Sequence, residues 1–224
     1  MLYSITLLAA LLAAAGSLAA PLTLHPRAAS TLEQTLLLIA PSSSTCASAP
    51  IAEQCRTASQ AALFIEKSFS TYNITSTPEK AALISLMAYE TASFKYNENM
   101  FPGRPGQGTR NMQMIGYNVL YVQSMPCMDE ELARAAGVGS AGVVSAEELS
   151  GGQANAVRRL VTGDDEMDFG SAAWFLTTQC SAEIRKGLQT EGLEGWARYI
   201  TECVGTTVAD RQVMFTAALA ALGG

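Results

Sequence analysis

The sequence predicts a mainly helical domain, and three observations support this fold class. Apolar residues recur at spacings of three and four, as at Leu83, Met87 and Phe94, which is the period of one helix face. The run Thr77-Pro78-Glu79-Lys80 is typical of a helix start, with a capping hydroxyl, a proline in the first turn and then an acid. No internal repeat and no sustained strand alternation are found.

The first thirty residues look like a targeting segment rather than part of the fold. Residues 2–15 are almost wholly apolar and uncharged, and Ser17-Leu18-Ala19 places small residues at a cleavage site. We therefore expect a secretory signal peptide at 1–19, a linker or short pro-segment at 20–30 and a single domain at 31–224. The alternative is a buried N-terminal helix. No later apolar run reaches the ~20 residues of a membrane span.

The helices of the domain follow from caps and apolar spacing, and the regions between them follow from glycine and proline. Loops are expected at 97–110, where Gly and Pro are frequent, at the glycine-spaced 137–145 and at the acidic 163–170. Helices are expected at 32–39, 51–72, 77–94, 111–125, 129–136, 147–161 with an interruption at Gly151-Gly152, 171–180, 182–188, 193–203 and from Thr207 or Asp210 to Leu222.

Composition excludes several classes of function. The 224 residues are 49% hydrophobic and 15% charged, which fits neither a disordered chain nor a coiled coil. The net charge is −6 and no basic block exceeds two residues, so binding to nucleic acid or an anionic membrane is not expected. The one histidine, His25, precedes the domain, which argues against a Ser-His-Asp triad, a Cys-His pair or a histidine-rich metal site. No cofactor and no metal are predicted.

The cysteines indicate an oxidising compartment. None of the five lies in a Cys-x-x-Cys pair, so disulfides are favoured over a zinc or redox motif. Cys46 with Cys55 would close a short loop, Cys180 with Cys203 would join two late helices, and Cys127 would be left over. Other pairings stay open. Asn73 begins an Asn-Ile-Thr acceptor for glycosylation, which fits export and a surface position.

Glu90 stands out as a candidate functional residue. It shares one helix face with Leu83, Met87 and Phe94, where the pattern calls for an apolar side chain. Partial burial and the negative end of the helix dipole both favour its protonated form, and such an acid can donate a proton. The alternative is that the helix is already fraying and Glu90 points to solvent.

Several runs together resemble the lysozyme-like superfamily, in particular lytic transglycosylases and plant-type chitinases. The resemblance covers about residues 78–205. It rests on Tyr-Glu-Thr-Ala-Ser-Phe at 89–94, Gly-Gln-Gly-Thr-Arg-Asn-Met-Gln-Met at 106–114, Gly-Tyr-Asn-Val-Leu-Tyr at 116–121, Ala-Ala-Trp-Phe-Leu at 172–176 and Gly-Trp-Ala-Arg-Tyr-Ile-Thr at 195–201.

The resemblance implies a lysozyme-like helical fold, with room for a small β-hairpin after the Glu90 helix, and a glycosidase or muramidase-like activity. Glu90 would be the general acid, and Gln113, Tyr117 and Asn118 would hold the substrate. Tyr89 stands where chitinases have histidine, and no second acid appears where they place one. Glu98 is the possible second carboxylate of an inverting mechanism.

The absence of a second carboxylate at the expected place favours a mechanism with one acid, assisted by the N-acetyl group of the substrate. The implied substrate is a β-1,4-linked polymer of N-acetylated amino sugars, peptidoglycan ahead of chitin, with hydrolysis or transglycosylation left open. The protein would be a secreted monomer that acts on this polysaccharide. Two alternatives are a secreted non-enzymatic helical protein that binds carbohydrate or a partner protein, and a carrier with an apolar cavity for a small ligand or lipid.

Overall fold

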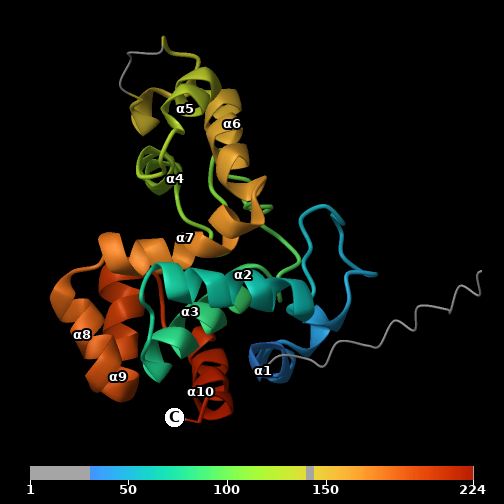
Figure 1. The fold of residues 1–224 in the computed structure, drawn as a ribbon, viewed down its shortest axis with the longest axis vertical. Helices are drawn as coiled ribbons and strands as arrows, with labels where there is room; N and C mark the ends of the chain where they lie inside the picture. Colours follow the sequence, from blue (N-terminus) through green and yellow to red (C-terminus); the bar gives the residue numbers. More distant parts are fainter. Residues whose placement is uncertain (1–30, 140–143, 224) are drawn as a thin grey trace, which may run out of the picture.

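The computed structural model describes residues 31–139 and 144–223 and confirms the mainly helical fold (Figure 1). Ten α-helices and three short segments of other helix types are found within these residues. The predicted signal peptide at 1–19 and linker at 20–30 lie outside the described part of the chain. After the Glu90 helix only isolated bridges form, from Gly108 to Glu98 and to Gln113, in place of the small β-hairpin.

The second and third helices begin at side-chain caps, Thr57 and Ser76. Thr57 and Gln60 form a reciprocal capping box, so the second helix starts at residue 58 and the prediction of a start at 51 is wrong. The third helix ends at Glu90 rather than 94, because Ala92, Ser93 and Phe94 all have positive φ. The elements are α1 (Thr31–Ile39), the 3-10 turn η1 (Pro41–Ser44), α2 (Ala58–Thr71) and α3 (Thr77–Glu90).

Two helices in the middle of the chain also start later than the sequence suggested, whereas the helix between them matches its prediction at 129–136. Thr109 and Met112 have positive φ, so the helix predicted from 111 begins at 115. A capping box between Ser150 and Gln153 places both glycines of Gly151-Gly152 in a first turn, where they begin a helix rather than interrupt one. The elements are α4 (Ile115–Gln123), α5 (Asp129–Ala136), η2 (Ala146–Glu148) and α6 (Gly151–Thr162).

The acidic run at 163–170 is the start of a helix and not a loop. The Asp164 carboxylate accepts hydrogen bonds from the backbone N–H groups of Glu166 and Met167, and the acids that follow lie at the positive end of the helix dipole. The last elements are α7 (Asp165–Thr178), α8 (Ala182–Thr190), α9 (Gly192–Arg198), the π-helical segment η3 (Tyr199–Val204) and α10 (Arg211–Ala221).

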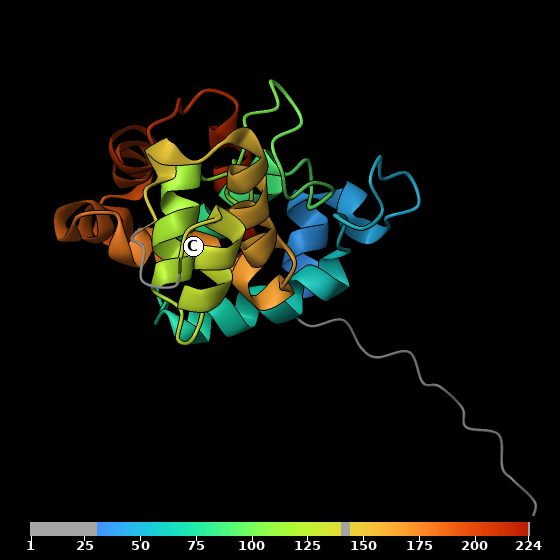
Figure 2. The ribbon, with the colours of Figure 1, turned by 90° about the horizontal axis from the view of Figure 1, so that it is seen from above.

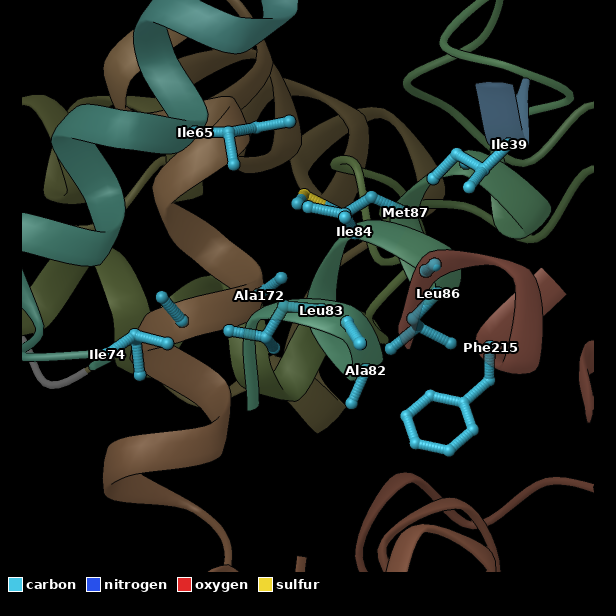
Figure 3. Packing of buried hydrophobic residues seen from close by; sticks show 14 of the residues in the cluster. Ile39, Ile65, Ile74, Ala82, Leu83, Ile84, Leu86, Met87, Ala172 and Phe215 are labelled. Atoms are coloured by element: carbon cyan, nitrogen blue, oxygen red, sulfur yellow. The ribbon is translucent and has the colours of Figure 1, made fainter. Parts of the chain in front are cut away.

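The helices form two lobes around two apolar clusters. In the first lobe α1–α3 and α8–α10 surround a cluster that includes Ile65, Leu83, Met87 and Phe215 (Figure 3). In the second lobe α4, α5 and α6 lie side by side (Figure 2). Helix α7 belongs to both, since its Phe169 packs in the first cluster and its Trp174 and Phe175 pack in the second.

A fully buried ion pair fixes the long loop after α3 to α7. The Nε atom of Arg110 lies 2.8 Å from Oδ2 of Asp168 as an ion-pair contact that is not aligned as a hydrogen bond, and both side chains have no solvent exposure. The Arg110 guanidinium donates to the carbonyls of Gln54, Phe94 and Tyr96 at 2.9, 3.1 and 3.1 Å. Through these bonds and the ion pair, Arg110 joins three parts of the chain that the sequence separates: the segment before α2, the turn after α3, and α7.

Both predicted disulfides are present, Cys46–Cys55 and Cys180–Cys203, and Cys127 is free and exposed. The second bridge joins the end of α7 to η3 and so ties the C-terminal helices to the helix shared by the lobes. Two bridges fit an oxidising compartment, as the sequence indicated. Among the helices that the structure describes, none is long and apolar enough to cross a membrane.

We expect Arg110→Met to destabilise the fold by about 3–5 kcal/mol, because it leaves the Asp168 charge buried without a partner. Urea unfolding followed by circular dichroism measures this loss. The double variant Arg110→Met/Asp168→Asn should recover part of the loss, because it buries no lone charge. Arg159→Met, at an exposed position on α6, is the control and should change stability little. A loss below ~1 kcal/mol for Arg110→Met would show that the pair does not hold the loop.

The pair also predicts a pH dependence of stability. Burial raises the pKa of Asp168 from 3.8 to about 6, although Arg110 and Asn97 act in the opposite direction. Since this pKa is higher in the folded state, the native protein binds more protons between these two values, and the contribution of Asp168 to stability declines as the pH rises through that window. The stability of wild type minus that of Asp168→Asn should fall between pH 4 and 7. A difference that is constant or rises over this range would contradict the assignment.

Candidate functional site

A cleft of about 310 Å³ opens between the two lobes. The first lobe contributes the end of α3 and the segment from η3 to the start of α10, and the opposite wall comes from the loop after α3 and the start of α4. Helix α7 contributes Phe175. The full lining is Glu90, Arg104, Gln107, Asn111, Met112, Gln113, Met114, Tyr117, Phe175, Val204, Gly205, Thr206 and Arg211.

Glu90 lies in this cleft, as the last residue of α3, but it is not a free acid. One of its carboxylate oxygens accepts hydrogen bonds from Nε and Nη2 of Arg211 at 2.9 and 2.7 Å. The side chains are 18% and 15% exposed, and the Arg211 guanidinium also lies 4.5 Å from the centre of the Tyr89 ring. The Glu90 carboxyl group is therefore paired with Arg211, and the isolated carboxyl group in apolar surroundings that the sequence suggested is not what the structure contains.

Gln113 and Tyr117 line the cleft as expected, whereas Asn118 does not. Asn118 is fully buried behind the wall, and its side chain continues a series of hydrogen bonds between amides. Asn111 donates to Gln113 at 3.3 Å, Gln113 donates to Asn118 at 2.8 Å, and Asn118 donates to the carbonyl of Gly106 at 2.7 Å. The role of this series is to hold the wall in place, because every link satisfies a polar group inside the protein.

Glu98 lies outside the cleft, in a neighbouring pocket that shares Glu90, Gln107 and Met112 with it. Its carboxylate forms an ion pair with Arg158 and accepts a hydrogen bond of 2.5 Å from Nε2 of Gln54. These contacts leave it tied to α6 and to the segment before α2. The structure therefore does not bring a second carboxylate into the cleft beside Glu90.

Sequence reasoning did not predict that Arg104 and Arg211 would line the same cleft. Arg104 lies on the glycine- and proline-rich loop, and within the described residues its side chain contacts no acid. Arg211 begins α10, 121 positions after its partner Glu90. A local pattern could not have paired them, although an arginine in the first turn of a helix, where the dipole disfavours it, was an available signal.

Asn73 is exposed in the short connection between α2 and α3, at positive φ. This position is compatible with the predicted glycan. Glycosylation of Asn73 stays a prediction.

Comparison with known proteins gives one informative match. A bifunctional dioxygenase–epoxy alcohol synthase of Fusarium oxysporum is 43% identical over 178 residues, which cover 80% of this chain and 13% of that protein. No family model matches, and no solved structure matches. The chain thus spans about one eighth of the relative, and the activities in the relative's name are those of the whole protein.

This match overturns the activity that the sequence motifs implied. A relative named for oxygenation and epoxy alcohol synthesis points to oxidative chemistry and not to a glycosidase or muramidase. The predicted polysaccharide substrate, peptidoglycan or chitin, is therefore wrong together with the predicted activity. The prediction from these motifs was wrong because each motif is a short run of common residues. Packing in the helical core explains their apolar positions as well as a glycosidase fold would. Likeness of the fold to lysozyme stays a prediction.

Proposed function

We propose that this chain is a ligand-binding region of an oxidative enzyme system and that its cleft binds a small organic anion. The observation that carries the proposal is the charge of the cleft. It contains two arginines and one carboxylate, and the carboxylate is already paired with Arg211, so Arg104 is left as the cation that an incoming ligand can meet. An anion bound there gains a charge-assisted hydrogen bond without displacing the Glu90–Arg211 pair.

The rest of the cleft suits an organic rather than an inorganic anion. Tyr117 and Phe175 meet edge to face, with ring centres 4.8 Å apart, and both line the cleft together with Met114 and Val204. Aromatic and aliphatic surface beside a few fixed polar groups is typical of sites for small organic molecules, and about 310 Å³ lies at the lower end of their size range.

The relative supports an oxidative setting for such a ligand. Its name describes dioxygenation, which adds oxygen to an organic compound, and the synthesis of an epoxy alcohol, which is an oxygenated organic compound. We assign this chain the binding of a substrate or product of such chemistry.

The activation of oxygen is a separate matter, because it usually takes a metal held by His, carboxylate or thiolate ligands. Residues 31–139 and 144–223 contain no histidine and no group of three His, Cys, Asp or Glu side chains placed to hold a metal. The donor set there does not fit such a centre, and we derive no oxygen-activating step through this chain.

Secretion is part of the same proposal. The two disulfides, the exposed Asn73 acceptor and the apolar sequence at 2–15 support an extracellular or secretory-pathway location.

The direct test is to titrate the protein with hexanoate and with hexanamide, its neutral counterpart of the same shape, by isothermal calorimetry or NMR. Hexanoate should bind more tightly, and Arg104→Gln should weaken its binding about fivefold while leaving hexanamide unchanged, because the lost contact is ionic and partly exposed to water. Arg134→Gln, at an exposed position of α5 that lines neither pocket, is the matched control. Equal binding of the two compounds, or no effect of Arg104→Gln, would show that the cleft does not select anions.

A further inference from the structure

A separate pocket, of about 140 Å³, lies between α2, α4 and α7, and we call it the junction pocket. It shares no residue with the cleft, although α4 and α7 contribute to both. Its size is close to that of the roughly 150 Å³ protein cavity known to bind benzene. Its lining residues are Phe64, Lys67, Ser68, Thr71, Tyr72, Tyr121, Met125, Glu166, Met167 and Gly170.

The wall of the junction pocket is rich in aromatic and thioether side chains. Phe64, Tyr72 and Tyr121 supply aromatic surface, and Met125 and Met167 supply thioethers, which contact aromatic rings favourably. The only charged groups in the lining, Lys67 and Glu166, form an ion pair with each other. A charged ligand would lose its hydration there without gaining a counter-ion, so a neutral ligand is favoured.

The tyrosine hydroxyls define what polar group the ligand must carry. The Tyr72 hydroxyl donates to the hydroxyl of Tyr121 at 3.5 Å, and Tyr121 donates to the carbonyl of Met167 at 3.2 Å. Burial raises the pKa of both tyrosines, so both hydroxyls keep their single proton at neutral pH. No donor among the described residues reaches the Tyr72 oxygen, so this oxygen is the acceptor that a ligand can meet.

Gly170 keeps the room that this arrangement needs. A Cβ atom at this position would lie 2.7 Å from the Tyr121 hydroxyl oxygen, so any other residue would displace Tyr121 or close the pocket. The neighbouring hydroxyls of Tyr72 and Tyr121 in the junction pocket therefore require that position 170 of α7 has no side chain.

We infer that the junction pocket is a second binding site, for a small neutral aromatic compound that carries one hydroxyl or N–H donor, of the size of phenol. The ring lies against Phe64, Tyr72 and the two methionines, and the donor group binds the Tyr72 oxygen. This site is separate from the anion site in the cleft, because the two pockets share no lining residue, and the two ligand classes also differ in charge.

Phenol and toluene are the probes, because they have similar shapes and only phenol has a donor. Titration of the folded protein followed by NMR shifts should show phenol binding at millimolar concentration, about fivefold more tightly than toluene, as one net hydrogen bond would give. Tyr72→Phe should bring the two compounds to equal affinity by weakening phenol alone. Gly170→Ala should abolish binding of both compounds.

The controls separate this site from the cleft and from misfolding. Tyr96→Phe, in the pocket beside the cleft, should leave the preference for phenol unchanged. If Gly170→Ala fails to fold, Met125→Trp, which fills the junction pocket from the turn after α4, replaces it and should abolish phenol binding. Equal affinity of phenol and toluene for wild type, an unchanged preference in Tyr72→Phe, or absence of phenol binding would each overturn the assignment.

Discussion

The ion pair between Arg110 and Asp168 is the constraint on which the cleft depends. Burial of a guanidinium costs free energy unless protein groups replace its contacts with water. The Arg110 guanidinium pairs with the Asp168 carboxylate, donates to three backbone carbonyls and lies 4.5 Å from the centre of the Phe169 ring. Those partners come from three places: the segment before α2, the turn that follows α3, and α7 itself. A long loop rich in glycine and proline, which would otherwise be mobile, thereby becomes a fixed wall of the cleft.

The lobes share α7, and α7 with α4 forms the floor of their junction. On α4, Tyr117 faces the cleft and Tyr121, one turn later, faces the junction pocket. On α7, Phe175 faces the cleft and Gly170 the junction pocket. The two sites thus lie about one turn apart along the same pair of helices, which explains how one helical scaffold can offer an anion site and a neutral aromatic site without sharing a side chain.

Features set by neighbouring residues could be predicted from the sequence. The helix start at Thr77, the helix at 129–136 and the Cys46–Cys55 bridge, with a separation of 9 residues, were predicted correctly because they are local, although the cap before Thr77 is Ser76 rather than Thr77 itself. The Cys180–Cys203 bridge, with a separation of 23 residues, was also predicted correctly. The position of Glu90 beside Gln113 and Tyr117 was also foreseen. Features set by distant residues could not be, because the run of positive φ at 92–94 and the partners of Arg110 and Glu90 depend on chain segments far away. The predicted activity was wrong for a related reason, since short motifs reflect the packing of a helix face and do not by themselves establish a chemical function.

Hydrogen exchange of the wild-type loop tests most directly whether the buried pair holds the wall. The amides of Gly108, Thr109 and Met112 donate to backbone carbonyls within the loop and its neighbours, at 3.1, 2.8 and 3.1 Å. If Arg110 and Asp168 fix the wall, these amides exchange as slowly as those in the middle of α3 and α7, because exposure requires breaking the buried pair. Fast exchange of the loop at residues 97–113, typical of a mobile surface segment, while α3 and α7 stay protected, would contradict the account.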